Sequence, residues 1–303
     1  MVFTGPAITL STLAKMPQIG LGTWLSSPGA VKGAVRQALD CGYRLIDTAE
    51  LYKNEAEIGE VINEYIVDGK IKREELFVTT KAWCSHFHPS DMENALRDSL
   101  KRLRLNYVDL YLAHEPGAFS TDMSKPDNSF TVEKVWKSLE GVYDKGLTKA
   151  IGVSNFSIPQ IERVVHSAKI PVHNVQVECY LYLPQFELAE VCKRNNISLT
   201  AYGPLGSPGR SSFKESGAKM EWKPGPIPLE DPLVKKLAEK YNKTPAQILL
   251  RHLLQRQIAI IPKSVNANRI KENFNIFDFE LTADEVNELN KPKHHQRLFF
   301  HDL

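Results

Sequence analysis

Four side chains with complementary acid–base chemistry stand at the ends of apolar runs in this sequence. Asp47, Lys81 and His114 each close such a run, and Tyr52 follows Asp47 by five residues. A free phenol has a pKa of about 10 and donates its proton poorly at neutral pH, whereas a neighbouring ammonium lowers that pKa. We therefore expect Tyr52 to act as an acid beside Lys81, and the set predicts reduction of a carbonyl.

The other two residues complete this interpretation. Asp47 would keep Lys81 protonated and directed inward, and His114 would orient the substrate carbonyl or share in the proton transfer. Taken singly, each position is better explained as a packed tyrosine, a solvated lysine or a histidine satisfied at a strand end. Their joint placement at three successive strand ends favours a catalytic site.

The composition narrows the class of protein. The chain has 303 residues, a hydrophobic fraction of 42%, a charged fraction of 24% and a formal net charge of +2. These values are typical of a globular protein, and the near-neutral charge gives no support to nucleic-acid binding. The four cysteines lack C-x-x-C and zinc spacings, so we expect free thiols in a reducing compartment. No signal peptide or membrane-spanning pattern is evident, and we predict a cytoplasmic monomer without a membrane partner.

Short β-rich runs alternate with helix-period segments along most of the chain. Near-continuous apolar strands separated by helices are typical of a parallel sheet buried on both faces. Eight such units favour a closed (β/α)8 TIM barrel over an open sheet, so we predict an α/β fold in which residues 1–303 form a single domain. The predicted strands are 19–23, 43–47, 76–81, 108–114, 150–156, 174–178, 198–203 and 258–264, and the clearest helices are 29–41, 55–67, 89–103, 132–145, 159–168 and 186–195.

Four segments interrupt this alternation. Residues 10–15 predict the turn of an N-terminal β-hairpin that plugs the bottom of the barrel. The stretches 115–131 and 206–231 are long, rich in Pro, Gly and Ser, and follow strand C-termini, while the tail 291–303 combines aromatic residues with His and Arg. Loops on the C-terminal face of a barrel usually set the choice of substrate, although each stretch is equally compatible with a solvated insertion.

Eight motifs make the chain resemble the aldo-keto reductase family, in its aldose and aldehyde reductase branch, along nearly the whole length. The resemblance implies a TIM barrel that binds a nicotinamide dinucleotide without a Rossmann domain, and Gly20 and Gly22 accordingly lack the third glycine of a dinucleotide-binding turn. The motifs, in the order of the family, are IGLGTW (19–24), GYRLIDTAELYKNEAEIG (42–59), FVTTKAW (77–83), VDLYLAH (108–114), IGVSNF (151–156), VQVE (175–178), AYGPLG (201–206) and IPKSVNANRIKEN (261–273).

The resemblance also implies roles for the nicotinamide end of the site. The four residues introduced first match the catalytic tetrad of the family. Ser154, Asn155 and Gln176 match the positions that hydrogen-bond the nicotinamide carboxamide, and Tyr202 matches the aromatic residue that stacks on the nicotinamide ring. A stacked ring with a fixed amide exposes one face, which would make hydride delivery stereospecific.

The motif 261–273 implies NADPH rather than NADH as the cofactor. Lys263, Ser264 and Arg269 match positions that surround the 2′-phosphate, for which the planar fork of arginine is well suited. Asn266 also suits a helix N-cap, which would direct the positive end of the helix dipole to the phosphate. Besides the nicotinamide ligands, the predicted cofactor contacts are Gly22, Thr23, Trp24, Asp47, Leu205, Ser207, Lys263, Ser264, Val265, Asn266, Arg269, Glu272 and Asn273.

The predicted substrate pocket adds aromatic walls to the catalytic side chains. Glu115 departs from the family, whose members commonly carry an aromatic residue there, and an inward carboxylate would disfavour carboxylate-bearing substrates. His86 and His88 form an H-x-H pair with no third ligand, so no metal is expected. The predicted pocket residues are Trp24, Tyr52, Trp83, His114, Glu115, Phe299 and Phe300.

These observations predict an NADPH-dependent enzyme that reduces small aldehydes or ketones to alcohols. One alternative is an NADP-dependent alcohol or dihydrodiol dehydrogenase, since the same catalytic residues would serve the oxidative direction. Another is a barrel retained as a cofactor-binding sensor or structural subunit, a role for which a complete tetrad is not needed.

Overall fold

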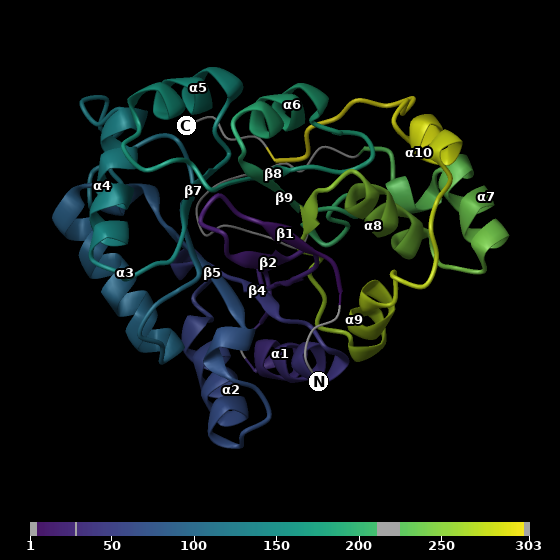
Figure 1. Ribbon diagram of the computed structural model, residues 1–303, viewed down its shortest axis with the longest axis horizontal. Helices are drawn as coiled ribbons and strands as arrows, with labels where there is room; N and C mark the ends of the chain where they lie inside the picture. The colour runs from purple at the N-terminus through teal and green to yellow at the C-terminus, as the bar shows by residue number, and fades with distance from the viewer. Residues whose placement is uncertain (1–4, 28, 211–224, 300–303) are drawn as a thin grey trace.

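A parallel sheet of eight strands forms the centre of the computed structural model, which describes residues 5–27, 29–210 and 225–299. The strands lie side by side in chain order, and each neighbouring pair is parallel. Nearly every strand residue is buried, as the continuous apolar runs predict. The strands are β3 (Leu21–Gly22), β4 (Leu45–Asp47), β5 (Phe77–Ala82), β6 (Leu110–Ala113), β7 (Ile151–Ser154), β8 (Asn174–Glu178), β9 (Ser198–Tyr202) and β10 (Ala259–Ile260) (Figure 1).

Backbone contacts between the first and last strands close this sheet into a barrel. Ile19 forms a parallel bridge with Ile260, and Gly22 forms another with Lys263. The Ile260 amide donates to the carbonyl of Gln18 over 2.9 Å. The predicted (β/α)8 TIM barrel is therefore confirmed, and the closure brings the two ends of the sheet together beside the predicted phosphate motif.

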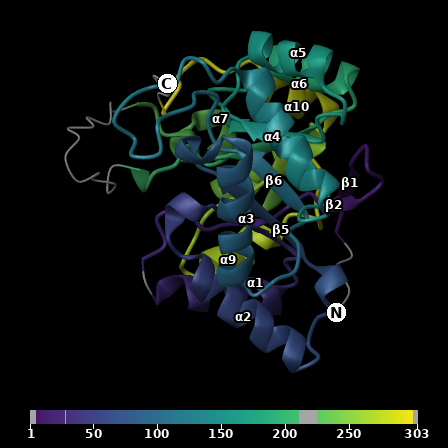
Figure 2. The same ribbon diagram turned by 90° about the vertical axis from the view of Figure 1, so that its left-hand side faces the viewer.

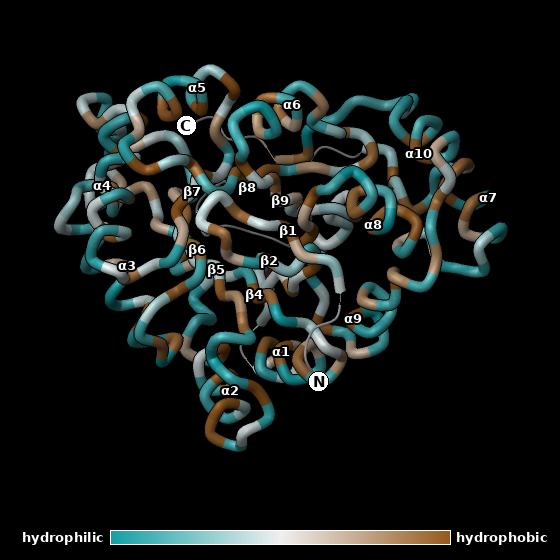
Figure 3. Tube along the Cα trace, in the orientation of Figure 1, coloured by the Kyte–Doolittle hydropathy of each residue, from teal (hydrophilic) through white to brown (hydrophobic). Residues whose placement is uncertain are grey.

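Helices connect the strands and cover the outside of the barrel (Figure 1). In α1, the residues Val31, Val35 and Leu39 recur every four positions and are buried against the sheet, which is the pattern of an amphipathic helix. In Figure 3 the brown segments concentrate on the strands, while the helices alternate between brown and teal. The helices are α1 (Ala30–Cys41), α2 (Glu55–Val67), α3 (Pro89–Leu103), α4 (Val132–Asp144), α5 (Ile158–Ser167), α6 (Phe186–Arg194), α7 (Pro232–Tyr241), α8 (Pro245–Gln255), α9 (Ala267–Phe274) and α10 (Ala283–Leu289).

The predicted N-terminal hairpin is present and lies across one end of the barrel. Its strands β1 (Ala7–Thr9) and β2 (Lys15–Pro17) are antiparallel, and they flank the predicted turn. Leu10 and Met16 are buried in one cluster with Leu45 and Phe77, which begin their barrel strands. The hairpin therefore packs at the N-terminal end of the strands, opposite the end where the predicted site residues lie (Figure 2).

Several predicted strands are too long at their ends. The last one was expected to extend over 258–264, but β10 contains only Ala259–Ile260. Pro262 has no backbone N–H to donate to a ladder, so regular pairing cannot continue through it. Of the long loop 206–231, residues 211–224 lie outside the described part of the chain. Each described helix is too short or too polar to cross a membrane.

Candidate active site

A buried ion pair lies at the C-terminal ends of β4 and β5. The ammonium of Lys81 donates to Asp47 Oδ1 over 2.6 Å and to the carbonyl of Thr48 over 2.9 Å. The other carboxylate oxygen, Asp47 Oδ2, accepts a hydrogen bond of 2.8 Å from Gln176 Nε2 on β8. Burial lowers the pKa of Lys81, and the negative charge of Asp47 opposes that shift. The expected pairing of these two side chains is present in the structure.

Tyr52 adds its phenol to this pair from the short 3-10 helix η1 (Glu50–Tyr52), which follows β4. The Lys81 ammonium lies 3.4 Å from Tyr52 Oη, within hydrogen-bonding reach. The sequence led us to expect a lowered phenol pKa, and the structure corrects this. Burial, followed by the negative charges of Asp47 and Glu115, raises the pKa of Tyr52 well above its ordinary value. The phenol is consequently held in its protonated, donor form.

The His114 imidazole packs beside the phenol and Trp83, and a second group of aromatic side chains surrounds Phe299. The imidazole of His114 lies edge to face with Tyr52, at 5.7 Å between ring centroids, and with Trp83, at 5.3 Å. Across the barrel mouth, Phe299 contacts both Trp24 and Tyr202 edge to face, each at 5.5 Å. Five of the seven predicted pocket residues follow the C-terminal ends of β3 to β6, a sixth, Phe299, contacts Trp24 and Tyr202, and Phe300 lies outside the described residues.

The predicted nicotinamide ligands lie on adjacent strand ends. Ser154 ends β7, and Asn155 follows it with a left-handed φ of 64° while its amide donates to the Gln176 carbonyl over 3.1 Å. Tyr202 ends β9 and donates from its hydroxyl to Asn155 Oδ1 over 2.8 Å. Because Gln176 also binds Asp47, these ligands and the ion pair belong to one hydrogen-bonded network.

The predicted phosphate-binding residues gather at the N-terminus of α9. Asn266 caps this helix by accepting a hydrogen bond of 3.0 Å from the Arg269 amide, as the sequence predicts. Burial lowers the pKa of Lys263, and the neighbouring positive charge of Arg269 lowers it further. Two cations held near each other at a helix N-terminus would bind an anion favourably. Val265 is 42% exposed, so this end of the helix is accessible to solvent.

The remaining predicted cofactor contacts are distributed along the same face. The hydroxyl of Thr23 donates to the carbonyl of Asp47 over 2.9 Å, which ties the segment after β3 to the ion pair. Ser207 has a left-handed φ of 44° in the turn after β9. Glu272 accepts from the hydroxyl of Thr244 over 2.8 Å. Of the others, Gly22, Ser264 and Asn273 are buried, whereas Trp24 and Leu205 are half-buried.

Two carboxylates that the sequence analysis left without a role also lie on this face. Glu178, at the end of β8, is fully buried and accepts hydrogen bonds from the amides of Leu298 and Phe299 over 2.8 and 3.0 Å. Glu50 accepts from the Trp83 amide over 2.5 Å and contacts His86 Nδ1 at 3.0 Å. An acidic residue at the end of a buried strand was the available signal for Glu178, as it was for Asp47.

The contact between Glu178 and the tail makes a testable prediction. Replacing Glu178 with glutamine leaves one acceptor for two amides, so Phe299 should lose its fixed position against Trp24 and Tyr202. We expect a several-fold rise in KM for bulky substrates and a stability loss of about 1–3 kcal/mol. Steady-state kinetics and urea unfolding measure the two effects. The exposed-residue variant Glu288→Gln serves as the control, and an unchanged KM in Glu178→Gln would contradict this role of the tail.

Other polar groups near the opening have structural partners. His86 pairs with Glu50, whereas His88 pairs with Asp127 at 3.1 Å, so the two histidines point to different partners. Among the described residues, no cluster of three or more His, Cys, Asp or Glu side chains could hold a metal ion. Burial raises the pKa of the Cys84 thiol to about 12, which keeps it protonated and unreactive at neutral pH.

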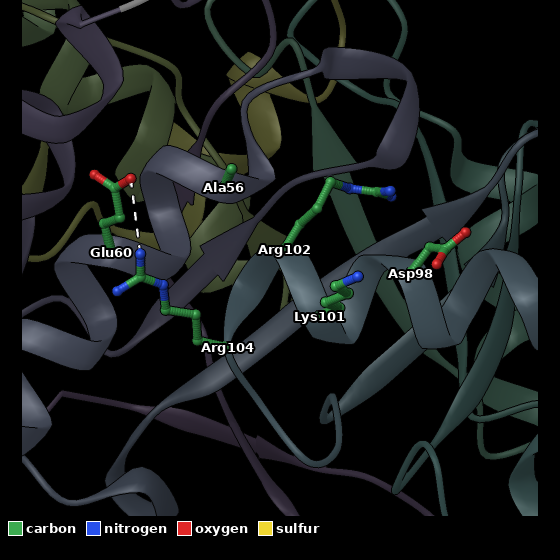
Figure 4. Close-up of a pocket in the computed structure, with 6 residues that line it drawn as sticks. All are labelled: Ala56, Glu60, Asp98, Lys101, Arg102 and Arg104. Carbon is green, nitrogen blue, oxygen red and sulfur yellow. Dashed lines mark ion pairs between the residues drawn. The ribbon is translucent and has the colours of Figure 1, made fainter.

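A hollow lies on the outside of the barrel, between α2 and α3 (Figure 4). Its charged side chains are of both signs, and Arg104 lies 3.9 Å from Glu60. Arg102 also binds the buried Glu55, with 2.8 Å from its Nε to the carboxylate. None of the site residues predicted from the sequence lines this hollow, which is formed by Ala56, Glu60, Asp98, Lys101, Arg102 and Arg104.

Comparisons with known proteins agree with this geometry. The profile described as "Aldo/keto reductase family" matches residues 18–293. Aldo-keto reductase family 1 member A1 of Gallus gallus is 48% identical over 292 residues, which cover 91% of this chain and 86% of that protein. The aldose reductase of Schistosoma japonicum superposes with a TM-score of 0.86 at 38% identity, covering 97% of this chain and 94% of the other. The aldo-keto reductase of Bombyx mori, solved in complex with NADP, superposes with a TM-score of 0.85 at 39% identity, covering 94% and 92% of the two chains. The chain therefore belongs to the aldo-keto reductase family.

Proposed function

We propose that this protein reduces aldehydes or ketones to alcohols with NADPH, using Tyr52 as the proton donor. The observation that carries the proposal is the buried network in which Lys81 contacts both Asp47 and Tyr52 at the mouth of the barrel. A phenol, an imidazole that could orient the carbonyl and several aromatic side chains lie together at the C-terminal ends of the strands. This is the end of a TIM barrel where catalysis takes place.

The residues present fit a nicotinamide dinucleotide phosphate. Asn155 and Gln176 offer amide groups at neighbouring strand ends, and Tyr202 offers a ring beside them. At the other end, Lys263 and Arg269 supply two positive charges that no described carboxylate pairs with in an ion pair. A site with amide ligands at one end and cations at the other suits this cofactor, which supplies the hydride when it is bound.

The protein's own groups then account for the proton. Negative charge develops on the carbonyl oxygen as the carbonyl carbon receives the hydride. Tyr52 donates its hydroxyl proton to that oxygen. The adjacent Lys81 ammonium stabilises the phenolate that results, and Asp47 holds that ammonium in place. His114 lies beside the phenol and would hydrogen-bond the same oxygen, which orients the carbonyl for attack on one face.

The same residues would also serve the alternative, alcohol or dihydrodiol oxidation, in which Tyr52 accepts the proton that it donates in reduction. Rates measured with NADPH and a carbonyl, and with NADP+ and the alcohol, distinguish the two directions. We further propose that residues 1–303 act as one domain, as a cytoplasmic monomer whose partner is a small carbonyl compound.

A carbonyl panel tests the proposed activity. The rate of NADPH consumption would be measured with aromatic and aliphatic aldehydes, sugars, α-dicarbonyls, quinones and ketosteroids, with NADH in parallel. We expect turnover of at least one class and a clear preference for NADPH. Tight NADPH binding without turnover of any member would instead favour a sensor or a structural subunit.

Arg269 provides the test of cofactor choice. Replacing Arg269 with alanine removes a planar cation from the proposed 2′-phosphate site, so the Kd for NADPH should rise by roughly ten- to a hundredfold, the equivalent of about 1.5–3 kcal/mol for a charge-assisted contact. The Kd for NADH, which lacks this phosphate, should change little. Titration of both cofactors by fluorescence measures the difference. Lys271→Ala, on the same helix, is the matched control. An equal rise in the Kd values of both cofactors would contradict the assignment of Arg269 to the 2′-phosphate.

A further inference from the structure

A buried carboxylate directly follows the candidate catalytic histidine. Glu115 is only 3% exposed, although it belongs to the loop after β6. Its Oε1 accepts a hydrogen bond of 2.8 Å from Asn155 Nδ2, and the backbone carbonyl of His114 accepts another of 3.0 Å from the same nitrogen. The contact joins the end of β6 to the residue after β7, which is a proposed cofactor ligand.

These two acceptors fix the orientation of the Asn155 amide. A carboxylate and a backbone carbonyl both accept hydrogen bonds, so only the NH2 group of Asn155 can face them. Its oxygen must then face the hydroxyl of Tyr202, which donates to it over 2.8 Å. The reversed amide would place oxygen against oxygen at Glu115 and at His114. The side chain of Asn155 therefore presents an acceptor to the site, with both of its hydrogens already used.

The negative charge of Glu115 also affects the pKa values of two hydroxyls in the site, those of Tyr52 and Tyr202. It raises the pKa of Tyr52 after burial and Asp47, and it raises the pKa of Tyr202 after burial and Glu178. A charge in this buried setting is screened less than a charge on the surface. Glu115 therefore adds negative potential to the space between the phenol of Tyr52 and the ring of Tyr202.

We propose that Glu115 is a positioning residue that locks Asn155 and whose charge strengthens the binding of oxidised nicotinamide relative to that of reduced nicotinamide. The inference rests on the proposed function, because it needs a nicotinamide cofactor beside Asn155 and Tyr202. The reduced ring is neutral, whereas the oxidised ring carries a positive charge. A fixed carboxylate on the same hydrogen-bonded chain stabilises the cation and has little effect on the neutral ring.

Equilibrium binding separates the charge of Glu115 from its shape. Kd values for NADP+ and for NADPH would be measured by fluorescence quenching on the full-length protein and on Glu115→Gln. Glutamine keeps an acceptor oxygen for Asn155 but has no charge. We expect the Kd for NADP+ to rise by roughly three- to tenfold more than the Kd for NADPH, the size expected for a charge pair several ångströms apart in a partly buried site. Glu115→Asp retains the charge and should keep the ratio of the unaltered protein.

The controls make each outcome decisive. Glu288→Gln, at an exposed position on α10, should leave both Kd values unchanged. Glu115→Leu removes charge and acceptor together, so it should weaken NADPH as well as NADP+. Equal changes in both Kd values for Glu115→Gln, or no change in either, would overturn the inference while leaving the proposed function intact. Failure of the unaltered protein to bind either cofactor would overturn the proposed function itself.

Discussion

Replacement of Tyr52 by phenylalanine is expected to lower kcat for carbonyl reduction by roughly 10²–10⁴-fold, the contribution typical of a positioned general acid. The change removes the only atom of Tyr52 that contacts Lys81 through a hydrogen bond, and it leaves the ring against His114. Because the ring remains, the Kd for NADPH should stay within about twofold, since no binding contact is removed. Steady-state rates and cofactor titrations measure the two quantities on the same preparation.

The matched control is Tyr65→Phe on α2. Tyr65 is also a buried phenol, and its hydroxyl donates to Asp40 over 2.7 Å on the outside of the barrel. Its loss should cost about 1 kcal/mol of stability and no activity. If the kcat of Tyr52→Phe equalled that of Tyr65→Phe, Tyr52 would not be the proton donor. This conclusion would hold whichever cofactor the protein binds.

The second large effect is expected at the ion pair between Asp47 and Lys81. Their side chains are 4% and 1% exposed, so removal of one partner leaves the other charge buried without compensation. Lys81→Met should lower the free energy of unfolding by about 3–5 kcal/mol. It should also lower kcat strongly, because the phenolate of Tyr52 would lose its neighbouring positive charge. Urea unfolding followed by circular dichroism, together with steady-state rates, measures both losses.

A double-mutant cycle isolates the pair. The double variant Asp47→Asn with Lys81→Met removes both charges, and it should be more stable than the sum of the single losses predicts, by about 1–3 kcal/mol. The exposed pair Arg163 and Glu133 is the control, with 2.7 Å between the charged groups and a coupling of at most about 1 kcal/mol. Additive losses at Asp47 and Lys81 would show that the buried pair does not act as a unit.

The barrel and most of the site were predictable because both depend on short-range patterns. Each strand is a short, almost fully buried segment; Asp47 is the last residue of β4, and Lys81 is the last but one of β5. Since parallel strands end at one face, a polar residue in that position can be placed without knowing any loop. The resemblance to the family supplied Gln176 and Tyr202, which the structure brings within hydrogen-bonding reach of Asp47 and Asn155.

What the sequence could not supply were contacts between distant segments. Glu178 holds the amide of Leu298 although the two are 120 positions apart, and Glu115 binds Asn155 across 40 positions. The periodicity of the sequence does not predict these two contacts, because they depend on the conformations of the loops and the tail. The predicted lowering of the pKa of Tyr52 was wrong because burial, followed by the negative charges of Asp47 and Glu115, raises it.

Transfer of deuterium tests the central claim most directly. The protein would be supplied with NADPH that carries deuterium at both positions of nicotinamide C4 and with the best carbonyl from the panel, and the alcohol would be examined by mass spectrometry. Our account predicts one deuterium on the former carbonyl carbon, formed by the unaltered protein and almost not at all by Tyr52→Phe. An alcohol without deuterium, or one formed equally by Tyr52→Phe, would contradict reduction by NADPH at this site.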